Sequence, residues 1–237
     1  MASTLITTVR KELARLGDPA KAPQMQAYMK SAMPYHGVPA PVLKKACRAL
    51  FRDLEWKNAK TWQTDMLGLW RSAKFREERY AALQLAAHRQ AAAFQTPTAM
   101  SSYEEMIVSG AWWDYVDDIA IHRVGPILAA YPKLMAKKML AWSHSNDLWK
   151  RRSSIICQIM LKEETDLELL YACIEPSLER EEFFLRKGIG WALREIAWRD
   201  PDEIIRYVKV HSEKLSPLSK REALKNVIKA GRIKRIP

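Results

Sequence analysis

The chain has 237 residues and a formal net charge of +12, with 39 Lys and Arg against 27 Asp and Glu. Hydrophobic residues make up 48% of the chain, enough to offset conformational entropy on folding, so a disordered protein is excluded. No apolar run approaches the roughly 20 residues of a membrane span, and three widely spaced cysteines give neither a disulfide framework nor a zinc motif.

The N-terminal residues lack the long apolar core of a secretion signal. From residue 5 onward, apolar residues recur every three or four positions, first in residues 5–16 and again in residues 42–51. This spacing predicts amphipathic helices, and no segment shows the alternation of a strand. We therefore expect an all-α protein. Because the sequence shows neither a disulfide framework nor a secretion signal, we expect it in the reducing cytoplasm.

Capping sequences mark the starts of later helices. A small polar residue or Asp that stands just before a helix can accept its free backbone N–H groups, and Pro fits the first helical position. Three segments have this form: Ser145-Asn146-Asp147, Asp200-Pro201-Asp202-Glu203 and Ser216-Pro217. We predict about twelve helices with short connections, forming one domain over residues 1–237.

Four basic residues recur in similar settings along the chain. Each follows an apolar residue by about one helical turn and precedes small residues: Arg79, Arg152, Lys187 and Arg221. The last three lie 35 and 34 residues apart, and Asp117 stands 35 residues before Arg152. A period near 35 residues is typical of paired-helix repeats such as HEAT or armadillo. We expect a short curved solenoid, whose inner helices line a concave face.

Aromatic and charged residues alternate at helical spacing around Asp117. Trp113 and Asp117 are four residues apart, Trp149 and Arg152 three, and Trp191 lies four residues after Lys187 and three before Arg194. Residues at these spacings share a helix face. One interpretation is a surface that binds nucleic acid, where cations neutralise phosphates and aromatic rings stack on bases or sugars. The other is a core of tryptophans beside a solvated charged face.

Five segments resemble, in order and spacing, the AlkD-like DNA glycosylases. This family of HEAT-like repeats excises positively charged alkylpurines from DNA. The segments are residues 26–30, 111–117, 147–152, 182–195 and 217–223. The resemblance covers nearly the whole chain and implies an all-α, HEAT-like solenoid whose concave face binds double-stranded DNA.

The resemblance also implies a catalytic set of Trp113, Asp117, Arg152 and Trp191. A carboxylate near the anomeric carbon stabilises an oxocarbenium-like sugar and can orient water. Indole ring faces attract a cation, and Arg152 is expected to hold a backbone phosphate. Asp114 and Asp118 are rivals of Asp117 that we interpret as capping or structural residues.

The remaining expected contacts with DNA come from aromatic and basic residues near these positions. Core packing is the alternative for Phe183 and Phe184, and an ion pair with Glu195 is the alternative for Arg194. The expected DNA-binding residues are Tyr28, Arg79, Trp149, Phe183, Phe184, Lys187, Arg194 and Arg221.

The predicted function is hydrolysis of the N-glycosidic bond of N3- and N7-alkylpurines in duplex DNA, as part of base excision repair. No Lys stands out as a Schiff-base nucleophile, so we expect a monofunctional enzyme that does not cleave the strand. We also expect a monomer that is associated with the nucleoid in the cytoplasm and uses no metal or organic cofactor. Two alternatives stay open: a non-catalytic binder of damaged or branched DNA, and a protein-binding scaffold. The scaffold would bind duplex DNA weakly, with an affinity indifferent to salt. A protein that contacts several phosphates would instead lose duplex affinity steeply as the salt concentration rises.

Overall fold

The computed structural model describes residues 2–237, with side chains from Thr4 onward. Within these residues every regular element is helical, which confirms the all-α prediction. Fourteen α-helices are present in this part of the chain, more than the expected twelve. No helix in residues 2–237 combines the length and apolar character needed to cross a lipid bilayer.

The chain divides into two compact units, residues 1–102 and residues 103–237. The prediction of a single domain stays a prediction beside this division. Unit 1 contains, in chain order, α1 (Ala2–Leu16), α2 (Ala22–Met29), α3 (Ala40–Leu50), α4 (Ala59–Ser72), α5 (Arg76–Ala86) and the 3-10 turns η1 (Arg89–Phe94) and η2 (Pro97–Ala99).

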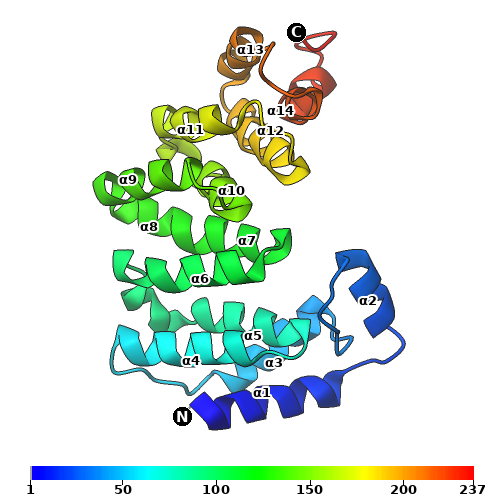
Figure 1. Ribbon diagram of the computed structural model, residues 1–237, viewed down its shortest axis with the longest axis vertical. Coiled ribbons are helices and arrows are strands. Elements are labelled where there is room, and N and C mark those ends of the chain that lie inside the picture. Colours follow the sequence, from blue (N-terminus) through cyan, green and yellow to red (C-terminus); the bar gives the residue numbers. More distant parts are fainter. Residues whose placement is uncertain (1) are drawn as a thin grey trace. The chain divides into compact units, whose positions relative to one another are not determined.

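Unit 1 is built around contacts among α1, α3, α4 and α5, and α4 and α5 run side by side (Figure 1). Trp62 and Trp70 of α4 are fully buried in its core. The buried Glu77 carboxylate of α5 accepts backbone N–H groups from His36, Gly37 and Val38 at 2.9–3.0 Å. A buried charge is stable when such donors surround it, so Glu77 fixes the segment that leads into α3.

Unit 2 begins within α6 and holds the other helices. They are α6 (Met100–Gly110), α7 (Trp113–Ile119), the π turn η3 (Ala120–Val124), α8 (Gly125–Ala130), α9 (Pro132–Ser143), α10 (Leu148–Ile156), η4 (Lys162–Glu164), α11 (Leu167–Ile174), η5 (Glu175–Ser177), α12 (Phe183–Ala197), α13 (Pro201–Val210) and α14 (Pro217–Lys229).

A π turn explains part of the difference in helix number. Residues 113–130 are helical throughout, and the π turn η3 separates α7 from α8. In this turn the Gly125 N–H donates to the Ala120 carbonyl, five residues earlier. Pro126 follows directly and has no N–H to continue the α-helical ladder. Such π turns occur often at functional sites, and this one begins three residues after Asp117.

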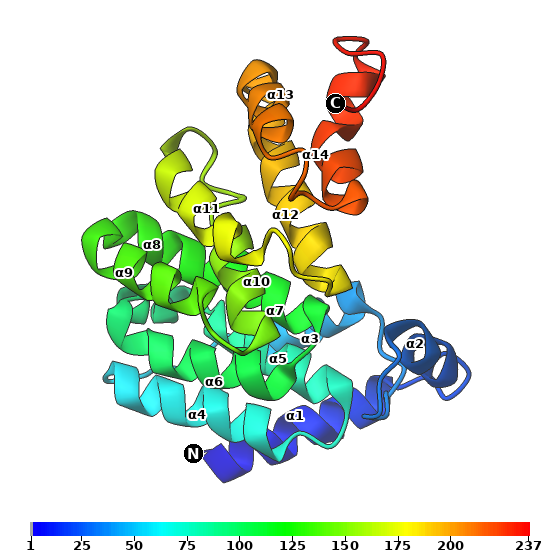
Figure 2. The ribbon, with the colours of Figure 1, turned by 45° about the horizontal axis from the view of Figure 1, so that its top comes forward.

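Helix α12 is the centre of unit 2. It contacts α10 on one side and α13 and α14 on others, and Figure 2 shows α14 alongside it. Gly190 makes the close approach to α14 possible, because a Cβ atom there would lie 2.8 Å from the Ser219 carbonyl oxygen. Leu185, Ile189 and Leu193 of α12 fill the core beneath.

The predicted helix starts are confirmed. Asp147 accepts the N–H groups of Trp149 and Lys150 at the start of α10. Asp200 caps α13 through the N–H of Glu203, and Ser216 caps α14 through the N–H of Ser219.

The repeated charged residues occupy equivalent positions in their helices. Asp117, Arg152, Lys187 and Arg221 are each the fifth residue of α7, α10, α12 and α14, respectively. Arg79 is the fourth residue of α5. The period of about 35 residues therefore corresponds to every second or third α-helix, each of which carries a charge one turn after it begins.

Candidate active site

Asp117 is placed by the first helix after a sharp turn in the backbone. Ala111 has a positive φ of 43°, Trp112 is extended, and α7 starts at Trp113. Tyr115, Val116 and Ile119 anchor the helix in the core with no exposed surface. The side chain of Asp117 is 15% exposed, so its carboxylate is largely enclosed but still in contact with solvent.

The Arg152 guanidinium holds this carboxylate with two parallel hydrogen bonds. Nε donates to Oδ1 at 2.7 Å and Nη2 donates to Oδ2 at 2.8 Å, while Nη1 donates to the backbone carbonyl of Phe184 at 2.5 Å. Arg152 comes from α10 and is only 4% exposed. Its bidentate geometry fixes both the position and the rotation of the Asp117 carboxylate.

Beside this arrangement, the expected contact between Arg152 and a DNA phosphate stays a prediction. Of the five guanidinium N–H groups, three donate within the protein, one from each nitrogen. The physical reason is burial: a cation removed from water must be paired. Within the protein, Arg152 fixes the position of the Asp117 carboxylate through two hydrogen bonds.

Gly188 of α12 leaves the space that Arg152 occupies. A Cβ atom at this position would lie 2.9 Å from Arg152 Nη1 and 3.5 Å from a methyl carbon of Ile156. The same helix supplies the Phe184 carbonyl that accepts from Arg152. Thus α7, α10 and α12 together define where the carboxylate lies.

Burial raises the pKa of Asp117 above its ordinary value. The hydrogen bonds and charge of Arg152 act in the opposite direction, and the nearby charge of Asp114 adds a small increase. A carboxylate in a partly dehydrated site interacts strongly with any positive charge that develops beside it. Asp114 itself lies in the first turn of α7, where a negative charge is favourable for the helix, in line with its interpretation as structural.

Three aromatic rings form a cluster beside the ion pair. The ring centroids of Trp112, Trp149 and Phe184 lie 5.0–6.3 Å from one another in tilted and edge-on arrangements, as aromatic pairs prefer. The Phe184 ring also lies 6.0 Å from the Arg152 guanidinium carbon. Trp112 was not predicted; the Trp112-Trp113 doublet was the only sequence signal for it.

Trp149 of α10 lies among these rings, and its expected contact with DNA stays a prediction. The residue is 7% exposed and packs within the aromatic cluster, which favours the interpretation of a core tryptophan. Phe184 is also partly buried there, which agrees with the packing alternative. Phe183, in contrast, is 59% exposed at the start of α12.

The two tryptophans of the expected catalytic set are both partly buried. Trp113 is the first residue of α7. Trp191 packs against the core of unit 2, and its indole N–H donates to Glu195 Oε1 at 3.1 Å. Their contact with a nucleotide stays a prediction.

Glu222 of α14 pairs two of the expected phosphate-binding cations. Its carboxylate lies 2.6 Å from Lys187 Nζ and 2.5 Å from Arg194 Nη1. The acidic partner of Arg194 is therefore Glu222, and not Glu195 as the alternative proposed, because α12 and α14 pack closely at this point. Arg221, next to Glu222, is exposed.

Two of the expected DNA-binding residues lie in unit 1. Tyr28 of α2 is 78% exposed. Arg79 of α5 is partly buried, with its guanidinium carbon 4.7 Å from the centre of the Trp70 ring. Among residues 2–237, no cluster of three or more His, Cys, Asp or Glu side chains could hold a metal ion.

Comparison with known proteins identifies the family. A family model described as DNA alkylation repair enzyme matches residues 9–227. A solved structure described as a predicted DNA alkylation repair enzyme from Enterococcus faecalis is 28% identical, with a TM-score of 0.75 over 90% of this chain and 97% of that one. No curated protein matches the chain. The sequence resemblance is thus confirmed, and the chain belongs to the DNA alkylation repair enzyme family.

Proposed function

We propose that this protein is a monofunctional DNA glycosylase that hydrolyses the N-glycosidic bond of cationic N3- and N7-alkylpurines in duplex DNA. The observation that carries the proposal is the Asp117 carboxylate, which the buried Arg152 orients through two hydrogen bonds while part of it stays exposed. Family membership supports a role in repair of alkylation damage.

The chemistry needs a carboxylate more than it needs an acid. An alkylpurine that already carries a positive charge leaves as a neutral base when the electrons of the C1′–N bond move onto it. The sugar then becomes cationic, and the negative charge of Asp117 stabilises this transition state. Water adds to C1′ and loses a proton, which gives an abasic site and the free base.

Arg152 acts through Asp117. Because its guanidinium is anchored to the Phe184 carbonyl as well, the carboxylate is oriented before DNA binds and needs no rearrangement during the reaction. Such preorganisation is a large part of electrostatic catalysis. Trp113 and Trp191 would supply aromatic faces for the cationic nucleotide.

The direct test is chromatography of the bases released from duplex DNA that contains N7-methylguanine. We expect the wild-type protein to release free 7-methylguanine. Turnover by Asp117→Asn should be lower by about 100-fold or more, the magnitude seen when one electrostatic stabiliser is lost. Asn keeps the size of the side chain, so duplex affinity should change little.

Asp118→Asn is the matched control, because it removes a charge from the adjacent position of α7 and should retain turnover. Thermal unfolding of each variant separates lost catalysis from lost folding. No release by the wild type, with duplex binding intact, would support the non-catalytic DNA binder instead.

A further inference from the structure

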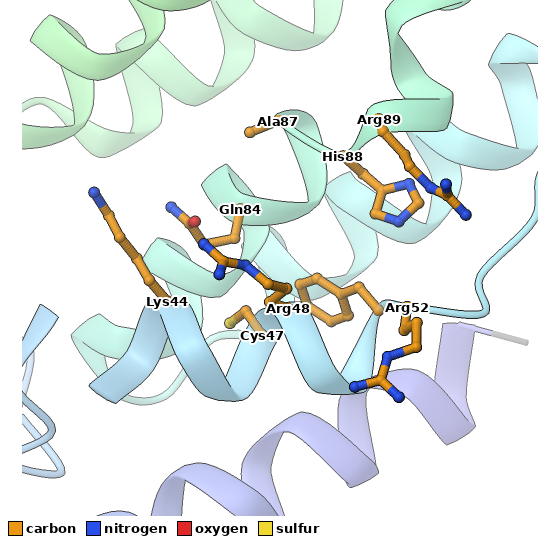
Figure 3. Close-up of a pocket in the computed structure, with 9 residues that line it drawn as sticks. Lys44, Cys47, Arg48, Arg52, Gln84, Ala87, His88 and Arg89 are labelled. Atoms are coloured by element: carbon orange, nitrogen blue, oxygen red, sulfur yellow. The ribbon is translucent and has the colours of Figure 1, made fainter. Parts of the chain in front are cut away.

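A basic hollow lies in unit 1, apart from the residues discussed above. It has a volume of about 530 Å³ and is lined by α3, the turn after it, the end of α5 and the segment that follows. Figure 3 shows Lys44 and Arg48 extending from α3, with His88 and Arg89 on the facing segment. Four of the lining side chains are permanent cations: Lys44, Arg48, Arg52 and Arg89.

These four cations have no acidic partners. None of the residues that line the hollow is acidic, and among residues 2–237 no carboxylate forms an ion pair with any of the four. Elsewhere neighbouring cations share one carboxylate: Glu104 pairs with Lys138 and Lys150. The hollow is therefore a concentration of positive charge that the protein itself leaves uncompensated.

The other lining groups suit an anion as well. Burial raises the pKa of Cys47 to about 12, so its thiol stays protonated and uncharged at neutral pH. Burial also lowers the pKa of His88, which keeps this ring from adding to the charge. Phe51 forms an apolar wall and Gln84 offers an amide. No group in the hollow repels a negative ligand.

The cations are spread along the hollow rather than gathered at one point. Lys44 and Arg48 are one turn apart on α3, about 6 Å along the helix axis, and Arg52 follows in the turn beyond it. A single phosphate ion would occupy only part of this row, whereas a nucleic-acid strand carries one phosphate every 3.4 Å or so of duplex axis.

We propose that this hollow is a phosphate-binding site separate from Asp117, which takes consecutive backbone phosphates of a nucleic-acid strand. The choice of a nucleic acid rests on the proposed function. The site itself rests on the unpaired cations, and it binds without regard to base sequence or damage because phosphate contacts carry no such information.

The test compares Lys44→Gln/Arg48→Gln with the matched control Lys133→Gln/Lys137→Gln. Both pairs are exposed and one helical turn apart, the first on α3 and the second on α9, and both variants lose two positive charges. The measurement is affinity for an unmodified duplex as a function of salt concentration. Because all four side chains are exposed, both variants should fold, which thermal unfolding checks.

A plot of log affinity against log salt has a negative slope, and each phosphate contact contributes about 0.9 to its magnitude. We expect this magnitude to be smaller by about 2 in the α3 variant than in the wild type. Affinity at moderate salt should fall about tenfold, and the α9 control should match the wild type. Equal slopes for the two variants, or no duplex binding by the wild type, would overturn the proposal.

Calorimetry with inorganic phosphate and with a nucleoside monophosphate distinguishes the sources of phosphate. If either binds the wild type as tightly as the duplex does, and the α3 variant does not bind it, the ligand is a free phosphate compound and the strand proposal is wrong. Unmodified DNA undergoes no base release, so these results do not depend on catalysis. A protein that releases no base but shows the slope change would retain this site and lose only the proposed function.

Discussion

In the proposed function, the buried charge of Arg152 serves the reaction through the Asp117 carboxylate that it holds. The guanidinium is 4% exposed and the carboxylate 15%, so the pair leaves only the anionic member within reach of a ligand. Removing one partner of such a pair strands the other charge in a poorly solvated site. The two residues are therefore expected to depend on each other for both stability and function.

The pH dependence of base release follows from the pKa of Asp117. Burial raises this pKa, so the carboxyl group takes up a proton at a higher pH than an ordinary Asp does, and only the ionised form stabilises a cationic sugar. Activity should therefore fall as pH drops through the raised pKa. Arg152 lowers the pKa of Asp117, so Arg152→Gln should move this acid limb to higher pH.

Rates of base release by the wild type and by Arg152→Gln between pH 4 and pH 8 would measure the position of the acid limb. A reference duplex at each pH would show whether the DNA stays double-stranded. An acid limb at the same pH in the wild type and in Arg152→Gln would contradict the positioning role of Arg152, even if the variant were slower. A purely structural defect would lower the rate at every pH and leave the limb in place.

At the scale of the helices, α12 brings residues of opposite character to its first turn. Phe183 is exposed, whereas Phe184 packs edge-on against Trp112 and beside Trp149. Neighbouring residues on a helix point in directions about 100° apart, so one turn can both support the ion pair and present an aromatic ring to a ligand.

Substitutions in this cluster should separate stability from binding. Trp149→Ala empties a core position and should lower the free energy of unfolding by about 3–5 kcal/mol. Phe183→Ala should change it by about 0.5 kcal/mol or less, because the ring is exposed, yet should weaken duplex binding. Denaturant unfolding and DNA titration measure the two effects. A stable Trp149→Ala protein with weakened DNA binding would instead support the expected contact of Trp149 with DNA.

At the scale of the whole molecule, the net charge of +12 acts on any polyanion that approaches. If the protein contacts six to ten phosphates, duplex affinity should fall by about 10³- to 10⁵-fold between 50 and 200 mM salt. Fluorescence anisotropy with a labelled duplex would measure this. Weak binding that does not change with salt would favour the protein-binding scaffold and count against the proposed function.

The helices were largely predictable because their signals are local. Asp147, Asp200 and Ser216 cap the helices that their sequences predicted, since a capping side chain bonds to N–H groups only two or three residues away. The period of the charged residues was predictable for the same reason: each stands one turn after a helix begins. The π turn at residues 120–124 had no comparable signal.

The sequence by itself determined that this is an all-helical, basic protein with one carboxylate placed among repeated cations, because spacing and composition are properties of the chain alone. The tertiary structure decided which charges are paired. Asp117 and Arg152 are 35 residues apart, and Lys187 and Glu222 are also 35 apart, so no local pattern specifies their contacts. Only packing buried Trp149 and Arg152, and only packing left Lys44 and Arg48 of α3 without an ion pair among the described residues.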